Sequence, residues 1–276
     1  MWLELGERRY DLTTRSLVMG ILNRTPDSFY DQGEYFDIDA FYARAERLVA
    51  DGADLLDVGG VKAGPGPAVS EAEELERVVP AIAALRARFD IPLSVDTWRA
   101  VVAAEAYRAG AVLGNDISGF ADPEYLRVAA AAGASVVATH IRLGPRIPDP
   151  DPQYDDLVGE VASFLVARAG QARAAGLPDE RIVLDAGLDL GKTATQSATL
   201  LRASDRLAGL GWPLLLSASN KTFLGVLFDL PIGARAEATI AAHALGVSLG
   251  CRIVRAHDVR AARRVCDTLA AVLEAA

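Results

Sequence analysis

Eight short apolar runs in this chain are each followed by polar side chains that could take part in chemistry. Carboxylates and amides suit the edge of a neutral heterocycle, because a carboxylate accepts two hydrogen bonds from an amino-lactam edge. An arginine and a histidine suit an anionic leaving group. In chain order these residues are Asn23, Asp57, Asp96, Asn115 with Asp116, His140, Asp185, Ser219 with Lys221, and Arg255 with His257.

Each of these residues alone has an ordinary structural interpretation. Asp96 and Asp116 could cap the helices that follow them. His140 could be a loop histidine with satisfied hydrogen bonds, and Lys221 a solvated surface charge. Together, however, they describe a ring of polar groups that a purely structural fold does not require, so we interpret the set as one active site.

Several other chemistries lack the residues they need. The sequence has no Cys/His cluster with zinc spacing, no HExxH and no GxSxG nucleophile elbow. The segment at 186–193 ends in Gly-Lys-Thr like a phosphate-binding loop, but Ala186 occupies the position of the first glycine. We interpret that segment as a strand-to-helix turn.

The apolar runs that precede the polar residues alternate with segments of helical period, which is typical of parallel strands joined by helices. The runs are almost continuously apolar, as strands buried on both faces must be. The predicted strands are Ser16 to Leu22, Leu55 to Val58, Pro92 to Val95, Val112 to Gly114, Ser135 to Thr139, Ile182 to Leu184, Leu214 to Ser217 and Ile253 to Val254.

Eight such units predict an α/β fold, a single (β/α)8 TIM barrel domain over residues 1–276. A doubly wound open sheet would also alternate strands and helices, but eight regular units without a dinucleotide fingerprint favour the barrel. In a barrel of this kind the carboxyl ends of the strands carry the active site. The polar residues above therefore all fall at one mouth.

Two segments stand outside the repeat. Residues 2–12, with Gly6-Glu7 in the middle, predict a short N-terminal β-hairpin that could close the lower mouth of the barrel. The Pro- and Asp-rich stretch at 145–152 predicts an irregular loop over the catalytic face.

The composition restricts partners and location. The formal net charge is −9, with 37 acidic against 28 basic residues, which opposes binding to nucleic acid or to anionic membranes. No apolar run approaches the roughly 18 residues of a membrane span, and the first residues lack the basic region, apolar stretch and cleavage site of a signal peptide, so we expect a cytoplasmic protein. The two cysteines, Cys251 and Cys266, are interpreted as small core residues.

The motifs carried by these strand ends resemble those of the dihydropteroate synthase family. They are NRTPDSF at 23–29, DVGG at 57–60, SVDT at 94–97, NDISG at 115–119, LDAG at 184–187, GKT at 191–193, SNKTFLG at 219–225 and RAHDV at 255–259. The resemblance implies a homodimeric barrel of folate biosynthesis. Its members join 6-hydroxymethyl-7,8-dihydropterin diphosphate to p-aminobenzoate and release diphosphate with the help of Mg²⁺.

The resemblance also implies roles for individual residues. Asp96, Asn115, Asp185 and Lys221 match residues that line the pterin pocket of the family, and Arg255 matches the arginine along the pterin face. His257 matches the histidine that contacts diphosphate, and Asn23 the asparagine associated with magnesium. Of these, His257, Lys221 and Arg255 are the expected catalytic residues.

The sequence departs from the family pattern mainly in the loops of the second substrate. After DVGG the family usually has Glu-Ser-Thr-Arg-Pro-Gly, whereas residues 61–66 read Val-Lys-Ala-Gly-Pro-Gly. The family's Ser-Arg-Lys is Ser219-Asn220-Lys221, and Arg24 replaces a small apolar residue. The expected residues of the p-aminobenzoate and diphosphate loops are therefore Ser219, Arg24 and Lys62.

Two interpretations remain open. In the first, the chain is a working synthase in which Arg24 or Lys62 has taken over the diphosphate charge. In the second, it is a pterin-binding paralogue with weak or no synthase activity, or with a different second substrate. Nothing in the sequence indicates a third possibility, the corrinoid-linked methyltransferases, which share the pterin pocket but need a cobalamin-protein partner.

Overall fold

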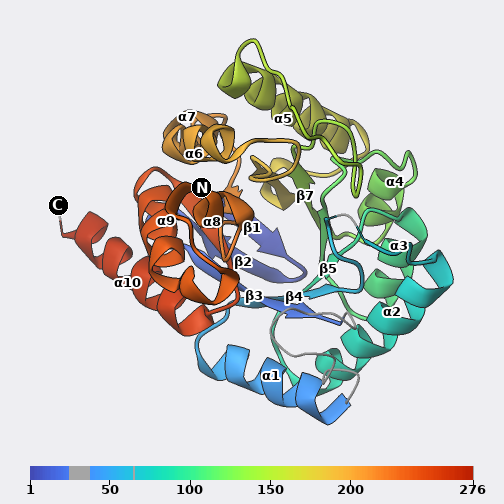
Figure 1. The fold of residues 1–276 in the computed structure, drawn as a ribbon. Coiled ribbons are helices and arrows are strands. Elements are labelled where there is room, and N and C mark those ends of the chain that lie inside the picture. The colour runs from blue at the N-terminus through green and yellow to red at the C-terminus, as the bar shows by residue number, and fades with distance from the viewer. Residues whose placement is uncertain (25–37, 65, 276) are drawn as a thin grey trace.

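The computed structural model describes residues 1–24, 38–64 and 66–275. Its centre is a closed barrel of eight parallel strands, in the order β10-β3-β4-β5-β6-β7-β8-β9. The helices lie around this barrel (Figure 1). The predicted TIM barrel is confirmed. None of the helices in the described ranges is long and apolar enough to cross a membrane.

Each predicted strand is present to within one or two residues at either end. The barrel strands are β3 Leu17–Asn23, β4 Leu55–Gly59, β5 Leu93–Asp96, β6 Leu113–Asp116, β7 Ser135–Thr139, β8 Ile182–Asp185, β9 Leu214–Leu216 and β10 Cys251–Ala256. Six of them include a polar residue that was predicted to follow an apolar run, because the strand pairing continues through that residue.

The helices follow the strands in turn, with two additional helices, α7 directly after α6 and α8 in the loop after β9. Their bounds are α1 Ile38–Ala50, α2 Glu71–Arg88, α3 Ala100–Arg108, α4 Tyr125–Ala131, α5 Leu157–Ala174, α6 Ala194–Arg202, α7 Ser204–Ala208, α8 Thr222–Phe228, α9 Ala236–Ser248 and α10 Val259–Glu274.

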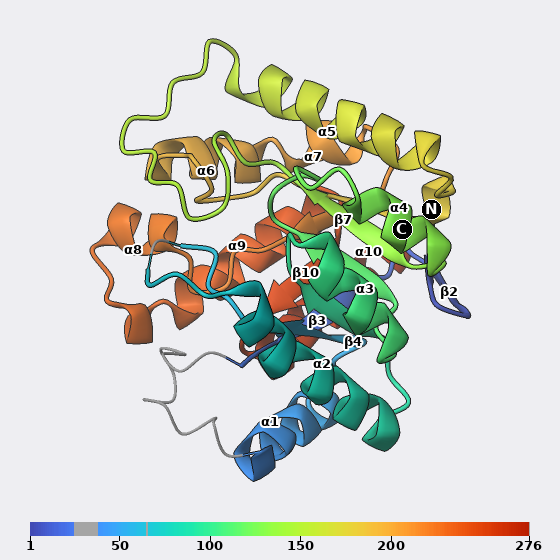
Figure 2. The ribbon, with the colours of Figure 1, turned by 90° about the vertical axis from the view of Figure 1, so that its right-hand side faces the viewer.

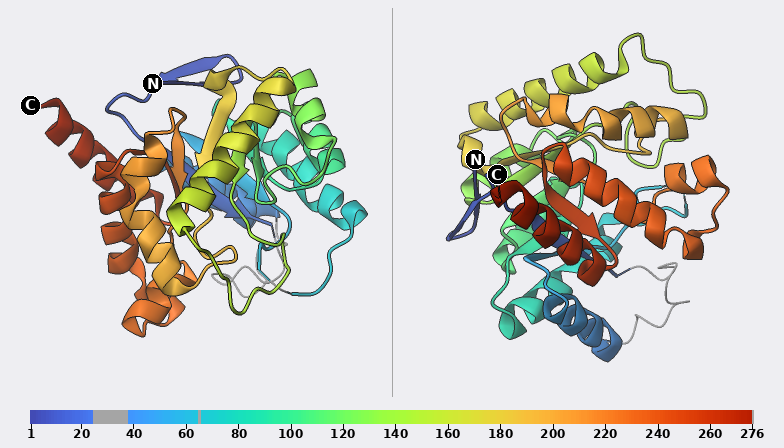
Figure 3. Two further views of the ribbon diagram at one scale, coloured as in Figure 1. Left: turned by 90° about the horizontal axis from the view of Figure 1, so that it is seen from above. Right: turned by 90° about the vertical axis from the view of Figure 1, so that its left-hand side faces the viewer.

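The predicted hairpin is also confirmed, as the antiparallel pair β1 Trp2–Leu5 and β2 Arg8–Asp11. Gly6 in its turn has φ +62, a left-handed conformation that glycine adopts without strain. Figure 2 shows this hairpin and α8 at opposite ends of the barrel. In the left view of Figure 3 the hairpin likewise lies at the far end from the loop that follows β7.

Two hydrophobic clusters pack against the strands, one on each face of the sheet. The outer cluster lies between strands and helices, and both free cysteines are buried, as expected. The inner cluster fills the lower half of the barrel with hairpin and strand side chains: Leu3, Leu5, Leu12, Leu17, Met19, Leu55, Leu113, Val137, Val183, Leu215 and Ile253. The hairpin thus closes the lower mouth with buried leucines.

The inner cluster determines where the polar side chains point. Successive residues of a strand face opposite sides, so a residue two positions after a member of the inner cluster also faces the interior. Leu55 is followed in this way by Asp57, Leu113 by Asn115, Val183 by Asp185 and Ile253 by Arg255. The polar layer therefore lies directly above the apolar layer, at the carboxyl ends of the strands.

Candidate active site

The centre of the polar layer is an ion-paired cluster around Arg255, the fifth residue of β10. Its Nε donates to Asp57 Oδ2 at 2.6 Å, and its Nη2 donates to Asp96 Oδ2 at 2.8 Å. The Asp57 side chain is fully buried, and that of Arg255 is 16% exposed. One guanidinium group thus connects β10 with β4 and β5 across the barrel. Its two contacts hold the plane of the guanidinium in a single orientation.

Asp57 has further partners that fill its acceptor positions. Ser94 Oγ donates to Asp57 Oδ1 at 2.6 Å, and Asn115 Nδ2 donates to Asp57 Oδ2 at 3.0 Å. These three hydrogen-bond donors, one of them a guanidinium, compensate the burial of the carboxylate. The amide nitrogen of Asn115 is therefore occupied by Asp57, and the amide oxygen remains as an acceptor for a ligand.

Asp96 is the carboxylate of the cluster that borders the mouth. Burial raises the pKa of the Asp96 carboxyl, while the positive charge of Arg255 opposes this rise. Asn23, at the end of β3, lies close by. A methyl group placed on Gly59 would be 3.1 Å from Asn23 Oδ1 and 3.4 Å from Asp96 Cβ. Glycine at this position lets the ends of three strands approach one another.

The opposite side of the mouth carries Asp185 and Lys221. Asp185 is buried and accepts the backbone N–H of Gly187 at 2.8 Å. Burial raises the pKa of the Asp185 carboxyl, and the charge of Lys221 opposes this rise more than any other cation does. Lys221 donates to the carbonyl of Leu188 at 2.6 Å, and burial lowers the pKa of its amine. The two side chains therefore face the same space.

A second lysine in this region was not predicted as a site residue. The buried amine of Lys192 lies 2.8 Å from His140 Nδ1 and donates to the carbonyls of Gly187 and Leu190 at 2.8 and 2.9 Å. These contacts join the loop after β8 to the end of β7. Burial lowers the pKa of Lys192 to about 7. Lys192 belongs to the Gly-Lys-Thr motif, and the interpretation of that motif as a turn gave no indication that its lysine would be buried.

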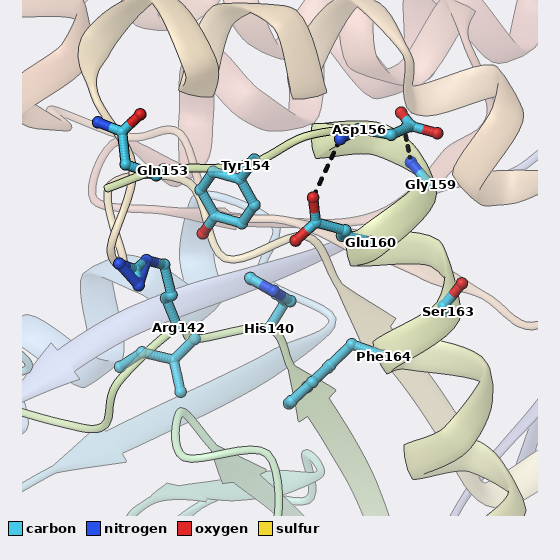
Figure 4. Close-up of a pocket in the computed structure, with 10 residues that line it drawn as sticks. His140, Arg142, Gln153, Tyr154, Asp156, Gly159, Glu160, Ser163 and Phe164 are labelled. Carbon is cyan, nitrogen blue, oxygen red and sulfur yellow. Dashed lines mark hydrogen bonds between the residues drawn. The ribbon is translucent and has the colours of Figure 1, made fainter. Parts of the chain in front are cut away.

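His140 also lines a hollow on the surface beside the mouth of the barrel. A cavity of about 650 Å³ lies between the loop after β7 and helix α5, lined by His140, Arg142, Tyr154, Glu160 and Phe164 among others (Figure 4). The Arg255 cluster does not line it. Glu160 accepts the backbone N–H of Asp156 at 3.0 Å at the start of α5, and Arg142 pairs with Asp149 at 3.1 Å. The hollow therefore shares His140 with the ring of polar residues but lies apart from the Arg255 cluster.

Ser219 and His257 form a third contact group, at the ends of β9 and β10. Ser219 Oγ lies 2.9 Å from His257 Nδ1 and accepts the backbone N–H of His257 at 3.1 Å. Burial, and after it the positive charge of Arg255, lowers the pKa of His257 to about 4. The imidazole is therefore neutral at neutral pH.

The loop cations Arg24 and Lys62 are partly exposed and follow β3 and β4. The Arg24 guanidinium lies 5.8 Å from the centre of the Phe41 ring. Residues 25–29 of the first motif, and Pro65 of the second loop, lie outside the described residues. The role of Arg24 and Lys62 in binding diphosphate stays a prediction.

Comparison with known proteins agrees with this geometry. A family model described as pterin binding enzyme matches residues 19–257. A dihydropteroate synthase from Synechocystis is 43% identical over 96% of this chain and 92% of its own length. The chain belongs to the dihydropteroate synthase family.

Two further proteins are similar to this dihydropteroate synthase family member over nearly its whole length. A protein of Mycobacterium leprae named inactive dihydropteroate synthase 2 is 44% identical over 94% of this chain and 91% of its own length. The crystal structure of Yersinia pestis dihydropteroate synthase with a sulfonamide drug has 37% identity and a TM-score of 0.94, and it covers all of both chains.

Replacing Arg255 by Gln should destabilise the fold and make its stability depend on pH. Two carboxylates would lose their shared cation, and breaking a buried ion pair costs about 3–5 kcal/mol. Without Arg255 the pKa of Asp96 rises further, so the folded state binds its proton more tightly than the unfolded state. The free energy of unfolding of the variant should therefore fall as the pH rises above about 4.

Urea unfolding at pH 5 and pH 8 measures this effect. The additional substitution Asp96→Asn should recover part of the loss at pH 8, because it removes one of the unpaired charges. Arg260→Gln serves as the control, since the Arg260 side chain is 68% exposed and its ion pair with Asp51 contributes little. An Arg255→Gln protein as stable as the wild type at pH 8 would contradict the assigned role of the ion pairs.

Proposed function

We propose that this family member joins 6-hydroxymethyl-7,8-dihydropterin diphosphate to p-aminobenzoate, releasing diphosphate, in folate biosynthesis. The observation that carries the proposal is the convergence of Asp96, Asn115, Asp185, Lys221 and Arg255 on one mouth of the barrel. These are the residues that the family resemblance assigned to the pterin. A cytoplasmic location stays a prediction from the sequence.

The pterin would be held by groups that are already oriented. The carboxylate of Asp185 can accept two hydrogen bonds from the amino-lactam edge of the ring. Asn115 offers its amide oxygen, because its nitrogen donates to Asp57. The guanidinium of Arg255 is fixed by Asp57 and Asp96, so its flat face can lie along the pterin ring. Such preorganised groups lose little entropy when the ligand binds.

In the proposed reaction the bond between the pterin methylene carbon and the diphosphate oxygen breaks, and a bond from that carbon to the arylamine nitrogen forms. The amine then loses a proton, which passes to the released diphosphate or to water. His257, neutral at neutral pH, donates a hydrogen bond to the departing diphosphate. Arg255 and Lys221 hold the pterin in the orientation that the amine attacks.

We also propose that Mg²⁺ assists the release of diphosphate and that Asn23 contributes to its binding. Among the described residues no three His, Cys, Asp or Glu side chains gather as a metal site. Mg²⁺ commonly binds through one or two protein oxygens together with substrate phosphates and waters, and the Asn23 oxygen beside Asp96 fits that chemistry. When bound, the ion would neutralise charge on the leaving group.

We propose that Arg24 and Lys62 supply positive charge to diphosphate in place of the arginine that the family has at position 64. Both follow strands at the catalytic mouth and are partly exposed, so their charged groups can reach a ligand. The protein would then depend on flexible side chains from two loops for the leaving group.

A second candidate function is pterin binding with little or no condensation activity. Two observations favour it. One is the departure of the second and seventh loops from the family pattern, at residues 62–64 and at Asn220. The other is the 44% identity to the protein named inactive dihydropteroate synthase 2. Both functions need the same pterin pocket, so pterin binding does not separate them.

Replacing Asp185 by Asn should weaken the binding of pterin analogues by about ten-fold or more. The substitution removes a charged acceptor, and a hydrogen bond to a charged group contributes about 1.5–3 kcal/mol. Isothermal titration calorimetry measures the affinity. Asp205→Asn, on α7 and exposed, is the matched control and should leave the affinity unchanged. Equal affinities for Asp185→Asn and wild type would remove Asp185 from the pterin site.

Condensation should be slow in the wild-type protein and should improve when the family loop is restored. We expect a diphosphate-release assay with p-aminobenzoate to show a kcat below about 1 s⁻¹. Orientation of two reactants contributes on the order of 7–11 kcal/mol to a barrier, so poor positioning of the amine lowers kcat more than it weakens binding of either ligand. A wild-type kcat of an efficient enzyme would show that the loop differences are neutral.

The restoring variant combines Lys62→Ser, Ala63→Thr and Gly64→Arg. A side chain fits at Gly64, since an added Cβ would meet nothing within 4 Å. Asn220→Arg belongs in a separate variant, because Asn220 has φ +56 and a left-handed backbone costs most residues about 1–2 kcal/mol. Single-turnover condensation should rise in the first variant while pterin affinity stays nearly constant.

Lys62→Ala and Arg24→Ala should each lower diphosphate affinity in the wild-type background.

We propose that the protein is a homodimer and that helix α8 contributes to its interface. Four large apolar side chains lie exposed in and just after this helix: Val226 at 66%, Leu227 at 42%, Phe228 at 61% and Ile232 at 43%. Patches of this kind mark association surfaces in water. Sedimentation should give a dimer for wild type and a monomer for Phe228→Asp. A wild-type monomer at micromolar concentration would contradict the proposal.

A further inference from the structure

The contact between Ser219 and His257 determines which nitrogen of the imidazole carries the proton. Ser219 Oγ accepts the backbone N–H of His257 at 3.1 Å, and this N–H can only donate. The Ser219 hydroxyl also carries a proton that needs an acceptor. Its partner in the described part of the chain is His257 Nδ1, at 2.9 Å.

If Nδ1 carried a proton, the Ser219 hydroxyl would have no acceptor among the described residues. Ser219 is only 8% exposed, so water offers little compensation, and a buried donor without a partner is costly. The arrangement that satisfies every group has the hydroxyl donating to a bare Nδ1. The proton of the neutral ring then lies on Nε2.

The backbone on both sides of His257 is fixed as well. Arg44 Nη2 donates to the His257 carbonyl at 2.6 Å, and the next residue, Asp258, caps α10 by accepting the N–H of Ala261 at 2.9 Å. The ring is therefore held at Nδ1 by Ser219 and through its backbone by α1 and α10. His257 remains partly exposed, and Nε2 makes no hydrogen bond within the described ranges.

We propose that Ser219 is a positioning residue that holds His257 as the Nε2–H tautomer and directs this N–H toward an anionic oxygen at the barrel mouth. The identity of that anion, the departing diphosphate, rests on the proposed function above. Ser219 then acts through the histidine, and its hydroxyl already has two partners before an arylamine arrives.

Nitrogen-15 NMR of the full-length protein tests the tautomer directly. The chain has only three histidines, so the imidazole spectrum is simple, and His257→Gln identifies the signals of residue 257. In the wild type we expect a bare Nδ1 and a protonated Nε2 at neutral pH. In Ser219→Ala the shifts of the two nitrogens should move toward each other as tautomers mix, and Ser219→Thr should restore the wild-type pattern.

The proposal is overturned if Nδ1 is protonated in the wild type, or if Ser219→Ala leaves both nitrogen shifts unchanged. The wild-type measurement alone decides the first point, even if a variant fails to fold. Ser204→Ala is the matched control, since Ser204 is a buried serine of α7 that donates to the Leu201 carbonyl at 2.7 Å, and its loss should not alter the His257 signals.

Calorimetry with inorganic diphosphate tests the consequence for binding. Loss of one hydrogen bond that orients the ring should lower diphosphate affinity about three-fold to ten-fold in Ser219→Ala, with recovery in Ser219→Thr. Equal affinity for wild type and Ser219→Ala would overturn the positioning role toward the anion. Failure of the wild type to bind diphosphate would instead contradict the proposed function, while the NMR result would still decide the tautomer.

Discussion

The site depends on a single buried cation shared by two carboxylates. Asp57 is fully buried, and a charged group there is tolerated only because Arg255, Ser94 and Asn115 donate to it. Arg255 in turn also pairs with Asp96 at the mouth. The network crosses from β10 to β4, β5 and β6, so a change in any of these strands alters the floor of the pocket. Stability of the barrel and shape of the ligand site are thus set by the same contacts.

Much of this arrangement could be predicted from the sequence, for identifiable reasons. Parallel strands buried on both faces are continuous apolar runs, so their number and positions were visible, and the rule that active residues follow such strands selected Asp96, Asn115, Asp185 and Arg255. The role of Asp57 was not predicted beyond its place in the ring. Its partners are 37, 58 and 198 residues away, and no local pattern encodes such pairings.

The contacts of Lys192 and Ser219 also could not be predicted, because their partners are distant in the sequence. The Gly-Lys-Thr motif was correctly interpreted as a turn that leads into α6, yet the burial of the lysine against His140 depends on how two loops fold over each other. Ser219 was expected in the loop of the second substrate, a role that stays a prediction. Its contact with His257 exists because β9 and β10 pair side by side in the closed barrel.

Most departures from the family pattern lie in the loops, and this difference has a physical reason. Strand ends are fixed by sheet pairing and by the apolar layer below them, so the barrel itself sets the positions of the pterin groups. Loops carry fewer such constraints. At Asn220 the backbone is left-handed with φ +56, a conformation that asparagine tolerates better than arginine does. Its backbone N–H donates to Thr239 at 3.1 Å, and its carbonyl accepts from Arg235 at 3.0 Å. Asparagine at position 220 therefore suits the conformation of this turn. The strand-end residues of the pterin site can stay the same while the loop residues that orient the second substrate diverge.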